Sequence, residues 1–354
     1  MVILGIETSC DETAAAVIKD GSELLSNVVA SSADLHAAYG GVVPEIAARS
    51  HVETILPVID KAVGEAYTSD PWQKIDAIAV THGPGLAGSL LVGVMTAKSL
   101  ALAKNKPLYA VNHVKAHVEA AFLTKTALPG YSLSKKQPHF PLLALIVSGG
   151  HTLLAQFSDH QNYKVLGQTT DDAVGEAFDK VAKMLGLPYP GGPSLAALAL
   201  KGDPQSVKLP TVKVGKYSFS FSGLKTAVLR ASQKMVGQDY TFPSTKLPKA
   251  LNGAQKANIA ASFQQKAVII LADSLKAAVE EYQPSSVVVA GGVAANLKLR
   301  QVIDSQIPLP VFFPDVKLCT DNAAMVAQEG YFQIKSGLTG VDPPSLDVIP
   351  NLSM

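Results

Sequence analysis

The chain has 354 residues and a mass of 37.0 kDa, which exceeds the size at which a single hydrophobic core usually stops growing, so we expect two lobes. Hydrophobic residues make up 47% of the chain and charged residues 17%, a balance that excludes an intrinsically disordered protein. No uninterrupted apolar run reaches the roughly 18 to 20 residues that span a bilayer, and no basic segment precedes the first apolar residues. We therefore expect a cytoplasmic protein with no membrane contact and no secretory signal.

The net charge of +1 is unevenly distributed along the chain. Residues 201–266, here called the basic segment, hold eleven Lys and Arg against two Asp, which makes this segment +9 and the remainder −8. Such an asymmetry is typical of a surface that meets a polyanion, although a solvated Lys-rich surface gives the same pattern. The two cysteines, Cys10 and Cys319, form neither a disulfide framework nor a C-x-x-C pair, which agrees with a reducing compartment.

The first predicted elements are two short strands joined by the polar turn 7–13, which together indicate a β-hairpin. Helix-period segments then alternate with short apolar runs, a pattern that favours parallel strand pairing. Pro57 is expected to kink or divide the first helix. The predicted helices are 45–67, 89–103 and 112–122, and the predicted strands between them are 77–80 and 108–111.

A second hairpin repeats this plan after a connection over 124–140, with a turn at 148–152. The two similar openings indicate a duplicated α/β fold with a cleft between its lobes. The remaining predicted elements are the helices 172–185 and 257–282 and the strands 217–221 and 286–290.

Three turns rich in glycine or hydroxyl residues follow apolar strands, at 7–13, 148–152 and 291–296. Backbone N–H groups in such turns can approach a phosphate closely, and a helix that follows adds a favourable dipole. One such turn is usually only a turn. Three of them in a duplicated chain indicate a phosphate-binding cleft.

His113 and His117 stand four residues apart on a predicted helix, a spacing that can chelate a metal but is also common on polar helix faces. Position 114 is Val, so the H-E-x-x-H pattern of zinc peptidases lacks its general base. Asp321, just before an apolar helix, is a candidate third ligand and an equally good candidate N-cap.

A series of segments resembles, in identity and order, the motifs of the TsaD family, the tRNA N6-adenosine threonylcarbamoyltransferases. The resemblance covers nearly the whole chain. One departure is Asn112, where a further histidine is common. The segments are 5–13, 40–45, 83–86, 113–117, 147–152, 175–180, 190–193, 219–226, 291–296 and 319–322.

The resemblance implies the duplicated actin-like, sugar-kinase and Hsp70 (ASKHA) fold, with two lobes around a central cleft. We expect an N-terminal lobe over 1–135, completed by the C-terminal helix at about 322–354, and a C-terminal lobe over 136–321 that carries the basic segment as an insertion.

The resemblance also implies the reaction. The family transfers threonylcarbamoyl from threonylcarbamoyl-AMP to N6 of the adenosine adjacent to the anticodon, in tRNAs that read codons beginning with A. It implies a tRNA substrate, and in bacteria two partner proteins, a TsaB-like paralogue and a TsaE-like ATPase. The basic segment would be one place for tRNA phosphates to dock.

The implied site residues fall into three groups. The implied metal ligands, for Fe²⁺ or Zn²⁺, are His113, His117 and Asp321. Asp11 and Glu12 are candidate proton acceptors, although the sequence does not identify a base. The implied substrate-binding residues are Ile146, Val147, Ser148, Gly149, Gly150, Asp179, Gly192 and Asn296.

Two other functions use the same motifs. An ASKHA-type ATPase or kinase would need the same phosphate turns and would turn over nucleotide without tRNA. A metallopeptidase would need a catalytic base beside the histidines, and Val114 counts against it.

Overall fold

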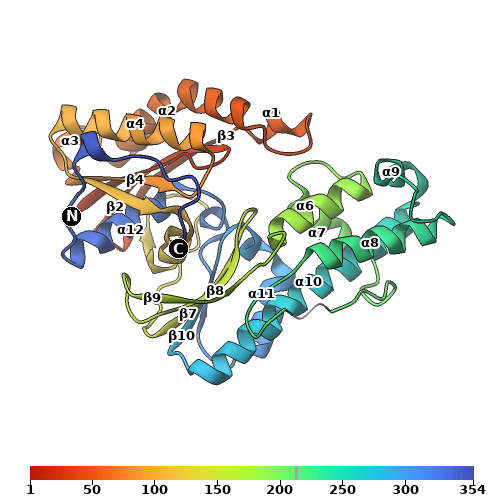
Figure 1. The fold of residues 1–354 in the computed structure, drawn as a ribbon. Helices are drawn as coiled ribbons and strands as arrows, with labels where there is room; N and C mark the ends of the chain where they lie inside the picture. Colours follow the sequence, from red (N-terminus) through yellow and green to blue (C-terminus); the bar gives the residue numbers. More distant parts are fainter. Residues whose placement is uncertain (212–213) are drawn as a thin grey trace.

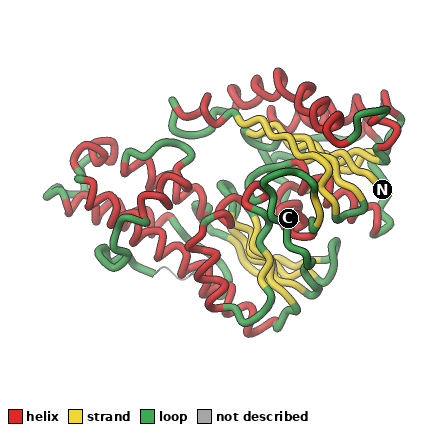
Figure 2. Tube along the Cα trace, turned by 180° about the vertical axis from the view of Figure 1, so that it is seen from behind, coloured by secondary structure: helices red, strands yellow, loops and turns green. Residues whose placement is uncertain are grey.

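The computed structural model describes residues 1–211 and 214–354. Two mixed β-sheets carry helices on their faces (Figure 1), and Figure 2 shows the sheets one above the other with a helical arm to one side. Each sheet contains an antiparallel hairpin whose first strand also pairs in parallel with a later strand. The predicted duplicated α/β fold is therefore confirmed.

The first sheet has six strands in the order β5-β4-β1-β2-β3-β6. Its central strand β1 is buried along its whole length, because helices cover both faces of the sheet. The elements of this part are β1 (Val2–Glu7), β2 (Glu12–Lys19), β3 (Glu23–Ser31), α1 (Ala33–Ala37), α2 (Pro44–Ala66), α3 (Pro71–Lys74), β4 (Ala77–Gly83), α4 (Ala87–Lys104), β5 (Leu108–Asn112), α5 (His113–Glu119), β6 (Lys125–Thr126) and, from the end of the chain, α12 (Ala323–Lys335).

The second sheet has five strands in the order β11-β10-β7-β8-β9. Its longest helix, α10, begins with a capping box in which Asn252 and Gln255 exchange side-chain and backbone hydrogen bonds. The elements are β7 (Leu142–Val147), β8 (Thr152–Phe157), β9 (Tyr163–Gln168), α6 (Val174–Leu185), α7 (Gly191–Ala199), α8 (Ser222–Met235), α9 (Leu247–Ala250), α10 (Gly253–Tyr282), β10 (Ser286–Ala290), α11 (Leu297–Gln306) and β11 (Val311–Phe312).

Helix α5 lies between the two sheets. Its Val114 and Val118 pack in the core of the second sheet, whereas Ala116 and Ala120, the latter in the 3₁₀ turn that follows, pack in the core of the first. Helix α12 packs against β1 and β2 and also against α5. The expected lobe boundaries, 1–135 with 322–354 and 136–321, stay a prediction.

One local prediction is wrong, and one of the two effects expected of Pro57, division of the helix, is excluded. Residues 217–221 form no strand, since only single bridges involve Ser218 and Phe219. The buried rings of Phe219 and Phe221 anchor this segment as a connection to α8. Pro57 does not divide α2, which continues to Ala66. Its exposed position leaves the carbonyl that it deprives of a hydrogen bond accessible to water.

Helix α4 is long and apolar enough to cross a membrane by length and composition alone, and it is the one such helix among the described residues. Lys98 lies within the helix, so its sequence is not an uninterrupted apolar run. Val94 and Ala97 are buried in the core that α4 shares with the first sheet and α2. The helix therefore forms part of the core.

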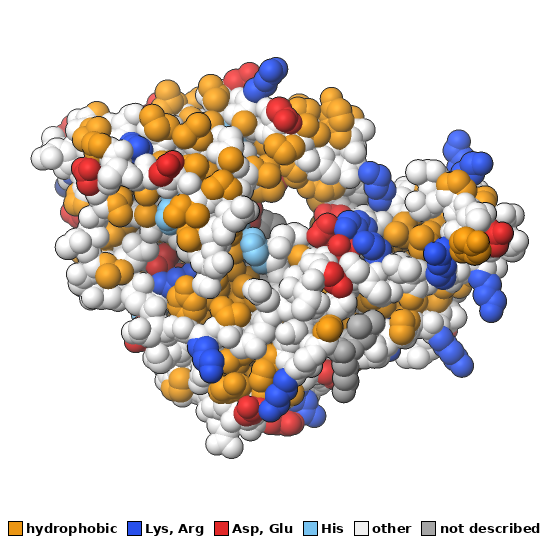
Figure 3. Space-filling view, viewed as in Figure 1, with side chains coloured by type: hydrophobic (Ala, Val, Ile, Leu, Met, Phe, Trp, Pro, Cys, Tyr) orange, Lys and Arg blue, Asp and Glu red, His pale blue; other side chains and the backbone are white. Residues whose placement is uncertain are grey.

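The basic segment forms most of the helical arm, which Figure 1 shows on the right around α8 and α9. Blue Lys and Arg side chains gather at this end of the molecule in Figure 3. Lys225 is paired with Asp172 at 2.6 Å, so this cation joins α8 to the start of α6. Lys213 lies outside the described residues.

Candidate active site

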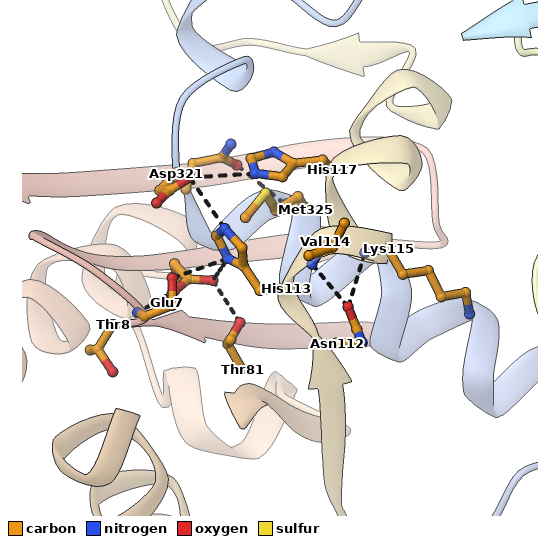
Figure 4. A network of polar contacts seen from close by, with 12 residues as sticks. Glu7, Thr8, Thr81, Asn112, His113, Val114, Lys115, His117, Asp321 and Met325 are labelled. Atoms are coloured by element: carbon orange, nitrogen blue, oxygen red, sulfur yellow. Dashed lines mark hydrogen bonds and ion pairs between the residues drawn. The ribbon is translucent and has the colours of Figure 1, made fainter. Parts of the chain in front are cut away.

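The side chain of Asn112, the last residue of β5, caps helix α5. Its Oδ1 accepts hydrogen bonds from the backbone N–H groups of Val114 at 2.9 Å and Lys115 at 3.2 Å, as an N-cap side chain does. His113 is therefore the first helical residue, and His117 follows about one turn later on the same face. Figure 4 shows both imidazoles directed at Asp321.

Asp321 lies in the loop before α12. The next residue, Asn322, caps that helix by accepting a hydrogen bond from the N–H of Met325, so Asp321 is not the N-cap. Its Oδ1 lies 3.5 Å from His113 Nε2 and 3.4 Å from His117 Nε2. One ligand atom from each of the three residues lies within 4.8 Å of the others. We call His113, His117 and Asp321 the metal group, because together they could hold one ion.

His117 provides the observation that favours a metal. Its side chain is 1% exposed. Among the described residues Nδ1 has no hydrogen-bond partner, and Nε2 contacts Asp321 Oδ1 at 3.4 Å without hydrogen-bond geometry. A buried polar atom without a partner is costly, and a bound cation would satisfy Nε2. Two imidazoles and one carboxylate suit transition metals such as iron or zinc. The residues present therefore fit the implied metal.

Glu7 is a functional candidate that the sequence reasoning missed. Its fully buried carboxylate places Oε2 at 3.0 Å from His113 Nδ1 and accepts a hydrogen bond from the hydroxyl of Thr81 at 2.6 Å. A carboxylate on the far nitrogen of a metal-binding histidine fixes its tautomer and orientation. The only sequence signal is an acidic residue that ends a fully apolar strand.

The carboxylates shift the titration of His113. Burial alone would lower its pKa, but Asp321 and Glu7 outweigh burial and raise the pKa to about 9. Burial opposes ionisation of Asp321 as well, and its histidine neighbours nevertheless hold the Asp321 pKa well below the usual value. The site therefore concentrates negative charge that a cation would neutralise.

A cavity of about 840 Å³ extends from the neighbourhood of the metal group between α1 and the helices α6 and α7. Figure 3 shows the surface deeply indented between the upper part of the molecule and the arm. Thr320, the neighbour of Asp321, lines this cavity. Of the implied site residues, the cavity wall contains Asp11, Glu12, Gly149, Asp179, Gly192 and Asn296.

Glycines leave room in this cavity wall. A Cβ placed on Gly149, Gly192 or Gly292 would meet no atom within 4 Å. Gly291 adopts φ +92°, and a Cβ there would lie 2.5 Å from the carbonyl oxygen of Val147, so only glycine fits this turn. The strand ends of β7 and β10 thus present bare backbone to the cavity, as a bound phosphate requires.

Asp179 and Asn296 each shape a helix start at the cavity. Asp179 Oδ1 accepts hydrogen bonds from the N–H groups of Gly191 at 2.8 Å and Gly192 at 3.2 Å, where α7 begins. Asn296 caps α11 through the N–H of Leu299 at 3.1 Å. Both residues have a structural role, and their contact with substrate stays a prediction.

Four implied substrate-binding residues lie outside the cavity wall. Ile146 and Val147 are fully buried in β7. Ser148 accepts a hydrogen bond from the N–H of His151 at 3.1 Å, and Gly150 is exposed in the same turn. These residues hold the turn that carries Gly149, and their direct contact with substrate stays a prediction.

One of the two candidate proton acceptors, Glu12, has a strongly shifted pKa. Burial, together with Asp321 and Asp11, raises the pKa of Glu12 to about 9. Glu12 is therefore protonated near neutral pH and would act there as a hydrogen-bond donor rather than as a base.

A duplicated fold with a glycine-lined cavity between two sheets defines a two-lobed protein of the ASKHA class, and solved structures share this fold. Component A of (R)-2-hydroxyglutaryl-CoA dehydratase from Acidaminococcus fermentans has a TM-score of 0.51 and 15% identity, and the match covers 95% of this chain and 99% of that chain. T. kodakarensis HypF has a TM-score of 0.58 and 14% identity over 96% of this chain and 48% of its own.

Sequence comparison defines the family. The model for TsaD, tRNA N6-adenosine threonylcarbamoyltransferase, matches residues 23–328. The enzyme of this description from Thermomicrobium roseum is 49% identical over 346 residues, with 96% of this chain and 93% of the relative covered. The one from Symbiobacterium thermophilum is 47% identical over 357 residues, with 100% and 97% covered. The chain therefore belongs to the tRNA N6-adenosine threonylcarbamoyltransferase family, which forms N6-threonylcarbamoyladenosine in tRNA.

Proposed function

We propose that the glycine-lined cavity binds threonylcarbamoyl-AMP and directs its carbamoyl carbon toward the metal group. The acceptor is N6 of the adenosine adjacent to the anticodon, in tRNAs that read codons beginning with A. The observation that carries this proposal is an adjacency in the chain: Thr320 lines the cavity, and the next residue, Asp321, belongs to the metal group.

The reaction forms one bond and breaks one. The N6 nitrogen attacks the carbamoyl carbon, the bond from that carbon to the phosphate oxygen breaks, AMP leaves and N6 loses a proton. Backbone N–H groups at the glycine turns would hold the phosphate and keep the adenylate in line for attack. Asp11, in the cavity wall, is the proposed proton acceptor.

The proposed ligands His113, His117 and Asp321 would hold Fe²⁺ or Zn²⁺, which supplies a Lewis acid for negative charge that develops during transfer. Glu7 holds the His113 ring by its other nitrogen, so the ligand face of α5 is oriented before substrate arrives. The chain's own contribution is thus an ordered group of ligands beside a cavity shaped for a nucleotide.

Membership of the family supports a proposal for two partner proteins. A TsaB-like paralogue needs an apolar surface, and α2 and α4 pack together and expose Val52, Leu56, Leu91 and Met95. We assign this face to the paralogue and place the reaction in the cytoplasm, where tRNA is available. Co-purification with a TsaB-like and a TsaE-like protein checks the two partners.

The test of the donor site uses labelled threonylcarbamoyl-AMP, unmodified tRNA and the partner proteins. Asp179→Asn retains an acceptor for Gly191 and Gly192 but removes the charge that would meet the donor. We expect the KM for the donor to rise about tenfold, the loss of roughly one charge-assisted hydrogen bond. The matched control is Asp304→Ala, an exposed carboxylate on α11. Unchanged donor KM in Asp179→Asn contradicts the assignment of Asp179.

A further inference from the structure

A second hollow, of about 340 Å³, lies on the other side of the turn that joins β7 to β8. Gly149 of this turn lines the large cavity, whereas His151 of the same turn lines the small hollow. The turn is closed by a 2.8 Å hydrogen bond from the N–H of Ser148 to the carbonyl oxygen of His151. One short, ordered turn therefore separates two binding spaces.

The large cavity and the small hollow each have one lining residue that is next in the sequence to a residue of the metal group. Val114, which follows His113, lines the small hollow, and Thr320, which precedes Asp321, lines the large cavity. Figure 4 shows Val114 on α5 beside His113. Each space is thus lined by a residue that neighbours a member of the metal group in the sequence.

The wall of the small hollow differs chemically from that of the cavity. None of its lining side chains is charged, whereas the cavity wall contains Asp11, Glu12, Asp179 and Lys298. A wall without Lys or Arg side chains does not suit a phosphate. The hollow lies within the range of about 300 to 1,000 Å³ that is usual for small-ligand sites.

Apolar and polar groups are both available in the small hollow. Val114, Leu153 and Val165 form an apolar side that belongs to the core of the second sheet. No hydrogen bond between described residues engages the ring nitrogens of His151 or the side-chain amide of Gln168. A neutral, planar heterocycle matches this combination.

We infer that the small hollow receives the adenine ring of the acceptor nucleoside, with N6 directed past His151 toward the metal group. This inference rests on the proposed function. The adenine must leave the base stack of the anticodon loop to enter, and an apolar wall with free hydrogen-bonding groups compensates for the lost stacking. Donor and acceptor then meet at the carbamoyl carbon from separate spaces, so neither has to displace the other.

The test fills the hollow from its exposed rim. Gln168→Trp places an indole at the end of β9, and Lys164→Trp places the same side chain on the same strand outside the hollow. Both variants are assayed with the partner proteins for transfer at varied tRNA and at varied donor. In parallel, an anticodon stem–loop that carries 2-aminopurine in place of the target adenine reports unstacking by its fluorescence.

With Gln168→Trp we expect kcat/KM for tRNA to fall about 100-fold, the donor KM and the metal content to stay within about twofold, and the fluorescence increase on binding to disappear. Lys164→Trp should match the unsubstituted protein in all these measurements. Normal kcat/KM for tRNA in Gln168→Trp, or a parallel rise in its donor KM, overturns the inference. Failure of the unsubstituted protein to form product contradicts the proposed function instead, and the fluorescence comparison still decides whether the hollow takes the base.

Discussion

A single buried carboxylate, Glu7, connects the end of the first strand to the metal group. It lies 106 positions before His113, yet its Oε2 sits 3.0 Å from the imidazole of that residue. Its second oxygen, Oε1, accepts a 2.5 Å hydrogen bond from the N–H of Ser9. Both carboxylate oxygens are therefore engaged, which holds the His113 ring in one orientation.

The first residue-scale prediction concerns metal retention. Glu7→Gln should weaken metal binding about 10- to 100-fold, because the amide orients His113 less strongly than the carboxylate does. His113→Ala combined with His117→Ala should abolish binding. Elemental analysis after dialysis against a graded chelator measures both, with the exposed Glu45→Gln as the matched control. Stoichiometric metal in the folded double-histidine variant would show that the ion lies elsewhere.

The second residue-scale prediction concerns pH. Glu329 is 1% exposed and contacts Lys115 at 2.6 Å, but burial raises its pKa to about 7. A carboxyl whose pKa is higher in the folded state stabilises the fold most at low pH. This stabilisation is lost as pH rises from the unfolded value, about 4.5, through about 7, and amounts to about 3 kcal/mol.

Urea unfolding across pH 5 to 8 measures this dependence. Glu329→Gln cannot ionise, so its free energy of unfolding should fall less steeply with pH over this window than that of the unsubstituted protein. Glu45→Gln again serves as the control, because it removes an exposed carboxyl. Parallel pH profiles for Glu329→Gln and the unsubstituted protein would contradict the assigned titration.

At the scale of elements, local patterns predicted most of the regular structure. The hairpin across residues 7–13 and the strand at 286–290 follow from short apolar runs bounded by polar or glycine turns. The alternation at 217–221 was misleading because Phe219 and Phe221 are core anchors of a connection and not residues of one sheet face. Tertiary packing overrides the period-two pattern in so short a segment.

The element-scale prediction concerns the arm. If the basic segment follows tRNA phosphates, reversing three exposed cations should weaken tRNA binding and reduce the salt dependence of its affinity by about one unit of slope for each phosphate that is no longer neutralised. Lys225 is excluded because it pairs with Asp172. The three substitutions are Lys208→Glu, Lys246→Glu and Lys249→Glu.

Matched reversals of three exposed cations elsewhere, Lys19→Glu, Lys74→Glu and Lys164→Glu, control for the change in net charge. Binding of a tRNA transcript is measured at several salt concentrations with the partner proteins present. Equal loss of affinity in the two triple variants would assign the effect to net charge and remove the arm from the tRNA interface.

At the scale of the molecule, the site exists because α5 lies between two sheets. The helix contributes His113 and His117, and the loop before α12 contributes Asp321 from more than 200 positions away. Neither periodicity nor spacing predicts a contact between residues so far apart in the sequence. For this reason the sequence patterns did not decide whether Asp321 is a metal ligand or an N-cap. The three metal ligands were predicted from the resemblance to the family, whereas the role of Glu7 in orienting His113 became visible only in the structure.

We propose that a nucleotide and a metal ion share one site between the sheets. The most direct test is a crystal structure of the metal-loaded protein with an unreactive analogue of threonylcarbamoyl-AMP, with anomalous scattering to locate the ion. We predict the anomalous peak between His113, His117 and Asp321, and the phosphate against the glycine turns of the 840 Å³ cavity. An ion held by other residues, or an adenylate bound outside this cavity, would show that nucleotide and metal do not share this site.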